Sequence, residues 1–280
     1  MLLKIETYEE TVVNHRTARD CFEQFADIEN PARAFWLDGA SSMGKSYLLD
    51  WFERNINDCH PVFFGLQDHA SIQVILLRLE SELNSTGIKT PRFSEVAKPK
   101  YAPSRNEVSD IEITDSPNTT ISQVIQHSQS ADEMLVVYLE QLRAIVRDVK
   151  SALESHDLPR FIIMFDQMER YDYVTKDFIF RLFAPELYRF ACFQFIFSGH
   201  KVTDSIRTVP LPEIRHSSLS VTLTPFTNSR DIANYLSANG SDLLASRDLD
   251  ALADRILAEC QGMPNLVGKF VRLLCDEKPT

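Results

Sequence analysis

The chain has 280 residues, and 44% of them are hydrophobic, which is enough for a buried core in one domain with an appendage or in two small domains. Its formal net charge of −11 argues against a nucleic-acid-binding protein that works through a broad basic face, because such binding needs clustered Lys and Arg. No apolar run approaches the roughly 18 residues that a membrane-spanning helix needs, and the N-terminus does not resemble a signal peptide.

The five cysteines are scattered, odd in number and without C-x-x-C spacing. This usage is typical of reduced thiols rather than of a disulfide framework. Cys59 and His60 are adjacent, but no second pair of metal ligands lies near them in the sequence, so we expect no metal site there. We therefore expect a cytoplasmic protein without a membrane partner, and nucleic acid is not an expected direct ligand.

Helices and apolar strands alternate along the first 225 residues. Because the main strands are apolar on both faces, the pattern predicts an α/β fold in which helices cover both sides of a parallel sheet. In chain order, the expected elements are a helix at 10–28, a strand at 34–37, a helix at 47–52, a strand at 61–66, a helix that starts at 68–71 and continues over 72–83, a helix at 131–154, a strand at 160–166, a helix at 176–190, a strand at 193–198 and a weaker strand at 219–223.

Two segments depart from this alternation. Residues 84–120 are rich in Ser, Thr, Pro and Asn, which indicates either a long, flexible and exposed insertion or an ordered loop in which residues 91–96 pack on the body. From Phe226 onward no strand is indicated. We therefore expect a core over residues 1–225, with the insertion at 84–120, and a small helical lid subdomain over 226–280. The helices expected in it are 228–237, 241–246, 248–260 and 264–275.

Residues 39–46 match the pattern G-x-x-x-x-G-K-S without a mismatch. The strand expected before them and the helix expected after them supply the setting that this phosphate-binding loop requires. Backbone N–H groups of the loop would surround the phosphates of a nucleotide, Lys45 would reach the β- and γ-phosphates, and the Ser46 hydroxyl would ligate Mg²⁺. The candidate nucleotide-binding residues are Gly39, Ala40, Ser41, Ser42, Met43, Gly44, Lys45, Ser46 and Tyr47.

Polar side chains also follow two further strands, at the edge of a parallel sheet where ligands bind. Asp166 ends the apolar run at 161–165 and could join Ser46 in the coordination shell of Mg²⁺, although an Asp there could instead cap a helix. Ser198 could hydrogen-bond the γ-phosphate or the attacking water, and His200 follows it closely. The sequence thus predicts that three strand ends meet around the phosphates.

Hydrolysis also needs a group that orients or deprotonates water. Glu169 could fold back into the site or form a salt bridge on the surface, and both alternatives stay open. Gln167 could position a water but is a poor base. No arginine stands obviously at a γ-phosphate position, although Arg170 and Arg207 are near in sequence.

These motifs, taken in order, resemble a bacterial signal-transducing ATPase of the STAND class, a relative of AAA+ ATPases that includes the NACHT and apoptotic-ATPase groups. The Walker A match at 39–46 is specific, and the others are weak alone but follow the family's order over residues 12–275. The matching segments are 13–16 (V-x-x-R), 39–46 (Walker A), 161–169 (Walker B with an acid-x-x-acid ending), 195–200 (sensor strand), 222–226 with 234–236 (lid entry) and 262–264 (Gly-x-Pro).

The resemblance implies a P-loop NTPase fold, a three-layer parallel sheet with a C-terminal helical lid, that binds ATP or ADP with Mg²⁺. Two departures matter: His200 stands where an arginine is usual, and the winged helix and sensor repeats of multidomain relatives do not follow, which indicates a stand-alone ATPase subunit or a fragment. The implied catalytic residues are Lys45, Asp166, Glu169, Ser198 and His200, the implied metal ligands are Ser46 and Asp166, and the residues implied to lie near the adenine are Arg16 and Pro264.

The expected function is an ATP-binding and slowly ATP-hydrolysing switch that regulates an effector or sensor protein supplied in trans, or copies of itself. The family context suggests bacterial defence or signalling as the setting. Two alternatives stay open: a module that binds nucleotide without hydrolysing it, and a small-molecule kinase. The kinase is disfavoured because such enzymes usually carry an arginine-rich lid, whereas this chain has the Gly262–Pro264 turn.

Overall fold

The computed structural model describes residues 16–27, 29–55, 58–65, 71–97, 131–155, 158–207, 214, 216–239, 248–264 and 266–270. The chain divides into two compact units, one of residues 1–70 with 159–280 and one of residues 71–158. This division separates the helices that lie between the second and third strands from the sheet. It does not address the boundary expected at residues 225 and 226, which stays a prediction.

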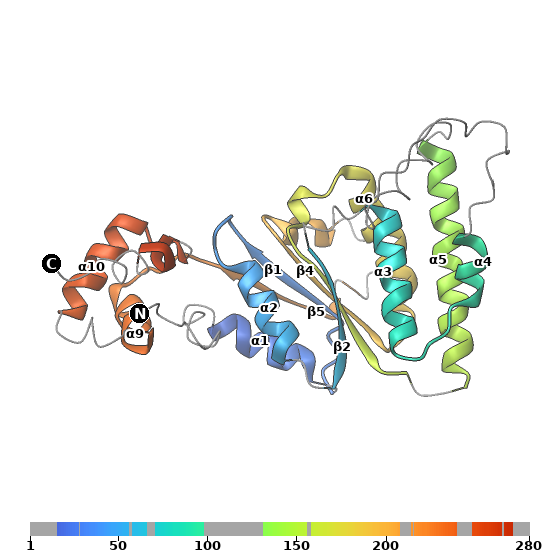
Figure 1. Ribbon diagram of the computed structural model, residues 1–280. Coiled ribbons are helices and arrows are strands. Elements are labelled where there is room, and N and C mark those ends of the chain that lie inside the picture. Colours follow the sequence, from blue (N-terminus) through green and yellow to red (C-terminus); the bar gives the residue numbers. More distant parts are fainter. Residues whose placement is uncertain are drawn as a thin grey trace, which may run out of the picture. The chain divides into compact units, whose positions relative to one another are not determined.

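A five-stranded parallel sheet forms the centre of the first unit (Figure 1). The strand order is β2-β3-β4-β1-β5, so the strand that leads into the phosphate-binding loop has neighbours on both sides. The central strands β1 and β4 are buried along their whole length, which is why their sequences are mostly apolar, with Asp38, Gln194 and Ser198 as buried polar residues. The strands are β1 (Ala34–Gly39), β2 (Cys59–Phe64), β3 (Arg160–Phe165), β4 (Phe193–Gly199) and β5 (Ser218–Leu223).

Helices cover both faces of this sheet, as the alternating sequence predicts. On one face, α1 (Arg16–Ala26) and α2 (Lys45–Asn55) pack on the sheet, and the rings of Phe22 and Phe52 stack with centroids 3.6 Å apart. On the other face, Phe180 packs against Trp36 and Phe197. The fold is therefore an α/β P-loop NTPase fold with a three-layer arrangement, as expected.

The helical segment between β3 and β4 differs in detail from the expected helix at 176–190. It begins earlier, because Asp172 caps α6 (Tyr173–Phe178) by accepting from the Thr175 amide at 2.8 Å. A π-helical turn, η4 (Ile179–Phe183), then leads into α7 (Ala184–Tyr188). Two short 3₁₀ helices, η3 (Met168–Arg170) and η5 (Val202–Arg207), follow β3 and β4.

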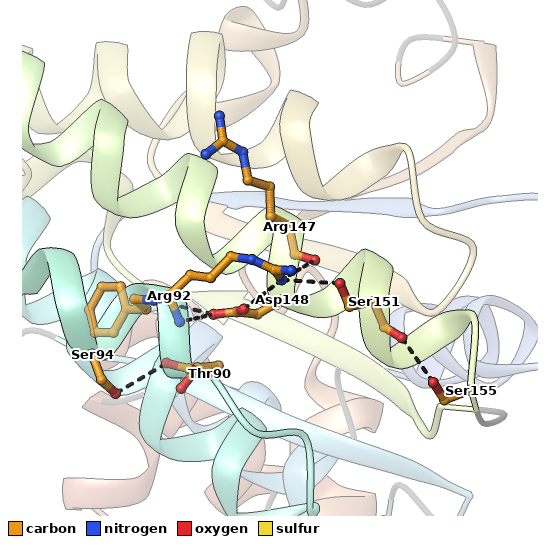
Figure 2. A network of polar contacts seen from close by, with 8 residues as sticks. Thr90, Arg92, Ser94, Arg147, Asp148, Ser151 and Ser155 are labelled. Atoms are coloured by element: carbon orange, nitrogen blue, oxygen red, sulfur yellow. Dashed lines mark hydrogen bonds and ion pairs between the residues drawn. The ribbon is translucent and has the colours of Figure 1, made fainter.

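The second unit consists of α3 (Ile72–Ser85), α4 (Pro91–Ala97) and α5 (Ala131–Leu153). Asp148 of α5 is buried and accepts hydrogen bonds from the amides of Arg92 and Phe93, while the Arg92 guanidinium lies 3.0 Å from the same carboxylate (Figure 2). Of the two interpretations of the insertion, the ordered one therefore holds for α4, whose Phe93 is buried. Residues 98–120 lie outside the described residues.

A separate hydrophobic cluster joins α9 (Ser229–Asn239) and α10 (Leu249–Cys260), which confirms two of the helices expected after Phe226. Residues 264 and 266–270 are also helical. The helix expected at 241–246 lies outside the described residues. The buried members of this cluster are Phe226, Ile232, Ala233, Leu236, Ala253, Ile256, Cys260 and Val267.

A backbone hydrogen bond at Gly262 links the start of this helical region to the turn that follows α10. The Phe226 amide donates to the Gly262 carbonyl oxygen at 2.8 Å, and Gly262 has a left-handed φ of +69°. A Cβ atom on Gly262 would lie 2.1 Å from the Phe226 carbonyl oxygen. Only glycine satisfies both the backbone conformation and this close approach.

Gly262→Ala should therefore destabilise the protein more than Gly87→Ala does. Gly87 has a similar φ of +88°, but a Cβ added there would have no atom within 4 Å, so the control shares the backbone cost without the clash. We expect Gly262→Ala to lower the unfolding free energy by at least about 2 kcal/mol more than the control, or roughly 4–8 °C in Tm. Equal losses in thermal unfolding would contradict this steric account.

Candidate functional site

The loop between β1 and α2 has the backbone of a phosphate-binding loop. Gly44 and Ser42 both have left-handed φ values, +83° and +69°, and α2 begins at Lys45. Met43 is buried beneath the loop in the hydrophobic cluster below the sheet face. The loop is thus anchored from below, while Ser41, Ser42 and Ser46 are exposed above it.

The Lys45 side chain folds back over this loop. Its Nζ donates to the carbonyl oxygens of Gly39 at 2.6 Å and Ala40 at 2.8 Å, and the residue is only 6% exposed. Burial lowers the pKa of Lys45, and the negative charges of Glu169 and Asp166, together with that of Asp38, oppose the shift. Lys45 is thus a buried cation whose described hydrogen-bond partners are two neutral carbonyl oxygens, and a bound anion could replace them.

Asp166 brings the phosphate-binding loop and two strand ends together. Its Oδ2 accepts from the Ser46 hydroxyl at 2.6 Å, and its Oδ1 accepts from the Ser198 hydroxyl at 3.0 Å and from the Gln167 amide at 2.8 Å. Asp166 is 2% exposed and Ser198 is fully buried. The structure therefore brings together Ser46 at the start of α2, Asp166 directly after β3 and Ser198 near the end of β4. Asp166 does not cap a helix through its side chain in any described contact.

Glu169 folds back toward the strand ends rather than forming a surface salt bridge in the described contacts. Its Oε2 accepts from the His200 amide at 3.0 Å, and a Cβ on Gly199 would lie 2.7 Å from the same oxygen. The carboxylate also contributes to the field at Lys45. The first of the two alternatives for Glu169 therefore matches the geometry, although the side chain remains exposed.

Asp38 is a site residue that the sequence reasoning missed. It is the next-to-last residue of β1, is 8% exposed, and accepts from the amides of Gly39 at 2.7 Å and Lys201 at 2.8 Å. Thr203 donates to it from its amide at 3.2 Å and from its hydroxyl at 2.5 Å. Burial alone would raise the pKa of Asp38, but these hydrogen bonds outweigh it and hold the pKa below its ordinary value. The signal available in the sequence was a carboxylate inside an apolar strand.

Two partly buried arginines, Arg33 and Arg160, lie away from the phosphate-binding loop. Arg33 donates to the carbonyl oxygens of Tyr188 at 2.7 Å and Phe193 at 3.2 Å and packs over the Tyr188 ring, so it ties α7 to the start of β4. Arg160 donates to Gln194 at 2.7 Å. Both stand at the beginnings of their strands, the edge opposite the phosphate-binding loop, so they are structural rather than phosphate ligands.

Tyr47, Arg170 and Pro264 are three further residues that the sequence singles out. Tyr47 is 51% exposed on α2, and Arg170 is exposed on η3. Pro264 begins the last helical segment, directly after Met263, which packs against the cluster containing Met43. The side chains of Arg16 and Arg207 lie outside the described part of the chain, so the structure does not test their expected contacts.

The donor set at the loop fits Mg²⁺ better than a transition metal. Ser46 and Asp166 offer hard oxygen ligands, and Mg²⁺ commonly takes only one or two protein ligands, the rest being phosphate oxygens and waters. Among the described residues, no group of three or more His, Cys, Asp or Glu side chains is gathered as a protein-only metal site would be. A cation here would thus require a bound phosphate to complete its shell.

No protein-family model matches the sequence, and no curated protein sequence matches it. Two solved structures are similar in fold: Cdc6p from Pyrobaculum aerophilum, with 15% identity and a TM-score of 0.47, and the ORC2 protein from Aeropyrum pernix, with 11% identity and a TM-score of 0.44. The alignments cover 90% and 91% of this chain but 59% and 58% of those proteins. The chain therefore spans about three fifths of each of them, and the fold assignment rests on the sheet order and the loop.

Within the described residues, no helix combines the length and the apolar character needed to cross a bilayer.

Removing the buried charge of Lys45 should stabilise the protein while no nucleotide is bound. Because the folded state lowers the pKa of Lys45, the charged form costs stability below that pKa, and the cost fades as pH rises toward the ordinary value of 10.5. Lys45→Met should therefore raise the free energy of unfolding at pH 7 by about 1 kcal/mol, or roughly 2–4 °C in Tm.

The gain should shrink between pH 7 and pH 10 in thermal unfolding measurements. Lys150→Met, which removes an exposed lysine from α5, is the control and should change Tm little at either pH. A Lys45→Met protein less stable than the wild type at pH 7 would show that the two carbonyl hydrogen bonds outweigh the cost of burial.

Proposed function

We propose that this chain binds ATP or ADP with Mg²⁺ at residues 39–46 and is a slow ATPase that acts as a switch, related to AAA+ proteins and to the STAND class. The observation that carries the proposal is the convergence of the Ser46 and Ser198 hydroxyls on the buried carboxylate of Asp166, at 2.6 and 3.0 Å. A metal ligand, a phosphate-sensing hydroxyl and the loop lysine thus occupy one edge of the sheet, where α/β folds bind ligands.

Each residue has a distinct task in this proposal. The loop amides and Lys45 hold the phosphates, and Lys45 exchanges the Gly39 and Ala40 carbonyl oxygens for phosphate oxygens. Ser46 and Asp166 would hold Mg²⁺, and the positive charge of the ion would offset the negative charge of the phosphates. Ser198 keeps Asp166 oriented and faces the terminal phosphate. Glu169 orients or deprotonates the attacking water once its carboxylate leaves the His200 amide.

The switch would involve the helical region after Phe226. Met263 packs against the cluster beneath the phosphate-binding loop, and Pro264 follows it, so nucleotide contacts there would bias the position of these helices. Arg16 and Pro264 would lie near the adenine. The output would pass to an effector or sensor protein supplied in trans, or to copies of this chain. The setting would be the cytoplasm, in bacterial defence or signalling.

One observation favours a second candidate, a module that binds nucleotide without hydrolysing it. The Glu169 carboxylate is held by the His200 amide, and His200 stands where an arginine would assist charge neutralisation. If this contact persists with nucleotide bound, no base reaches the water. Binding and hydrolysis therefore need separate measurements.

Phosphate release and nucleotide binding, measured on the same samples, separate the two candidates. Lys45→Ala should abolish binding, while Glu169→Gln should bind ATP normally and release phosphate at least about 100-fold more slowly than the wild type. Glu186→Gln, which disrupts a surface pair with Arg189 on α7, is the control and should match the wild type. If wild-type phosphate release does not exceed that of Lys45→Ala although nucleotide stays bound, the non-hydrolysing module is correct.

The metal assignment makes an independent prediction for Asp166→Asn. Magnesium should tighten ADP binding to the wild type by about tenfold or more, a difference of about 1.4 kcal/mol, and this gain should vanish in the variant. The measurement is calorimetric titration with ADP in Mg²⁺ and in EDTA. Asp177→Asn, which alters a surface pair with Arg181, should keep the metal dependence. A full magnesium effect in Asp166→Asn would show that Asp166 does not hold the metal.

A further inference from the structure

The carboxylate of Asp38 joins the phosphate-binding loop to the segment that follows β4. Asp38 pairs with Gly199 at the end of the β1–β4 register, so the backbone ladder stops there. Beyond this pair, the Asp38 side chain makes the contacts between the two segments. One carboxylate oxygen accepts from the amides of Gly39 and Lys201, and the other accepts from the amide and hydroxyl of Thr203. Four donors from two segments thus converge on one buried carboxylate.

The turn after β4, residues 199–203, is held from its other side by Glu169. The His200 amide donates to Glu169, and the next amide, that of Lys201, donates to Asp38. Lys201 has a left-handed φ of +55°, which is uncommon for a residue with a side chain. Successive amides in such a turn form a concave donor site for anions. Here the two amides bind two carboxylates, one from the end of β1 and one from beyond β3.

The peptide groups on both sides of Gly39 are fixed as well. Asp38 accepts from the Gly39 amide at 2.7 Å, and Lys45 donates to the Gly39 carbonyl oxygen at 2.6 Å. When Lys45 turns to a phosphate, Asp38 remains as the contact that keeps the beginning of the loop in place. The same carboxylate holds the turn that follows Ser198, so a displacement of either segment is transmitted to the other.

We propose that Asp38 is a positioning residue that makes the phosphate-binding loop and residues 199–203 respond together to the terminal phosphate, and so sets the preference between ATP and ADP. This inference rests on the proposed nucleotide binding. Without the Asp38 contacts, the turn loses its link to the phosphate-binding loop and can move away from the terminal phosphate, whereas the loop amides still hold the α- and β-phosphates. Loss of Asp38 therefore weakens ATP binding more than ADP binding.

The chain offers a matched control for this carboxylate. Asp172 makes the same two kinds of contact with Thr175, from its amide and from its hydroxyl, both at 2.8 Å, but it caps α6. A merely structural carboxylate–threonine pair should lower stability when it is broken and leave nucleotide preference unchanged. Asp38 and Thr203 should change the preference as well.

The test measures dissociation constants for ADP and for a non-hydrolysable ATP analogue, both with Mg²⁺, by calorimetry at a temperature where every variant is folded. Asp38→Asn and Thr203→Val should weaken the analogue relative to ADP by at least about fivefold. Thr203→Ser, which retains the hydroxyl, should restore the wild-type ratio. Asp172→Asn and Thr175→Val should leave the ratio unchanged. Thr203→Val tests the inference even if Asp38→Asn fails to fold, because it removes a single hydrogen bond.

The outcomes separate this inference from the proposed function. If the wild type binds both nucleotides through Lys45 but Thr203→Val keeps the wild-type ratio, Asp38 is only structural and the inference is wrong while nucleotide binding stands. If ADP and the analogue weaken equally in both variants, the inference is also overturned. A wild type that binds neither nucleotide would overturn both.

Discussion

The buried carboxylate of Asp166 imposes the constraint on which the rest of the site depends. A carboxylate that is 2% exposed loses its hydration, and the loss is tolerable only when protein donors replace the water. Its donors come from Ser46 at the start of α2, from Ser198 at the end of β4 and from the adjacent backbone. The hydrogen bonds to this carboxylate therefore fix the loop after β1 against the ends of β3 and β4. In the sheet, β4 lies between β3 and β1, so these three strand ends are neighbours.

The charges around the loop explain why a cation is expected with the nucleotide. Lys45 faces the carboxylates of Glu169, Asp166 and Asp38. Four neutral donors hydrogen-bond Asp38 and three hydrogen-bond Asp166, which stabilises both carboxylates but leaves their negative charges in place. The remaining acid, Glu169, lies exposed beside the site and would repel a phosphate. A divalent cation held through Ser46 and Asp166 would offset this repulsion, so the acidic surroundings favour a metal-bound nucleotide over a bare one.

The fold and the phosphate-binding loop could be predicted because their signals are local. The central strands are mostly apolar. The loop motif lies between a strand and a helix, and its residue types alone indicate that it binds phosphate. The sequence indicates the edge strand β5 more weakly because more exposed and more buried residues alternate along it, so it contains no continuous apolar run. The helix after β3 was misplaced at its start because Asp172 caps it, and no periodicity reveals the π-helical turn at Ile179–Phe183. These are errors of boundaries rather than of elements.

Asp38 was missed for a different reason, since its partners other than Gly39 lie more than 160 residues away along the chain. A carboxylate at the end of an apolar strand looks like the first polar residue of a loop until the strand order is known. The same long-range pairing decided between the two alternatives for Glu169, whose oxygen reaches the amide of His200. Sequence patterns therefore named the residue types at the strand ends, whereas the contacts among them depend on which strands are neighbours.

Under the proposed function, the hydrogen bond from the His200 amide to Glu169 would separate a switch from a static nucleotide-binding module. The His200 amide donates to Glu169, and the next amide, that of Lys201, donates to Asp38, so the two carboxylates hold adjacent peptide groups. A terminal phosphate near Ser198 would compete with Glu169 for donors at this turn, because both are anions and the donors are few. Release of Glu169 would then place a carboxylate beside the phosphate at the moment the phosphate arrives. Under the proposed function, Glu169 would thus be withheld from the water while the terminal position is empty and would become available when it is filled, which is the order of events that a nucleotide-dependent switch requires.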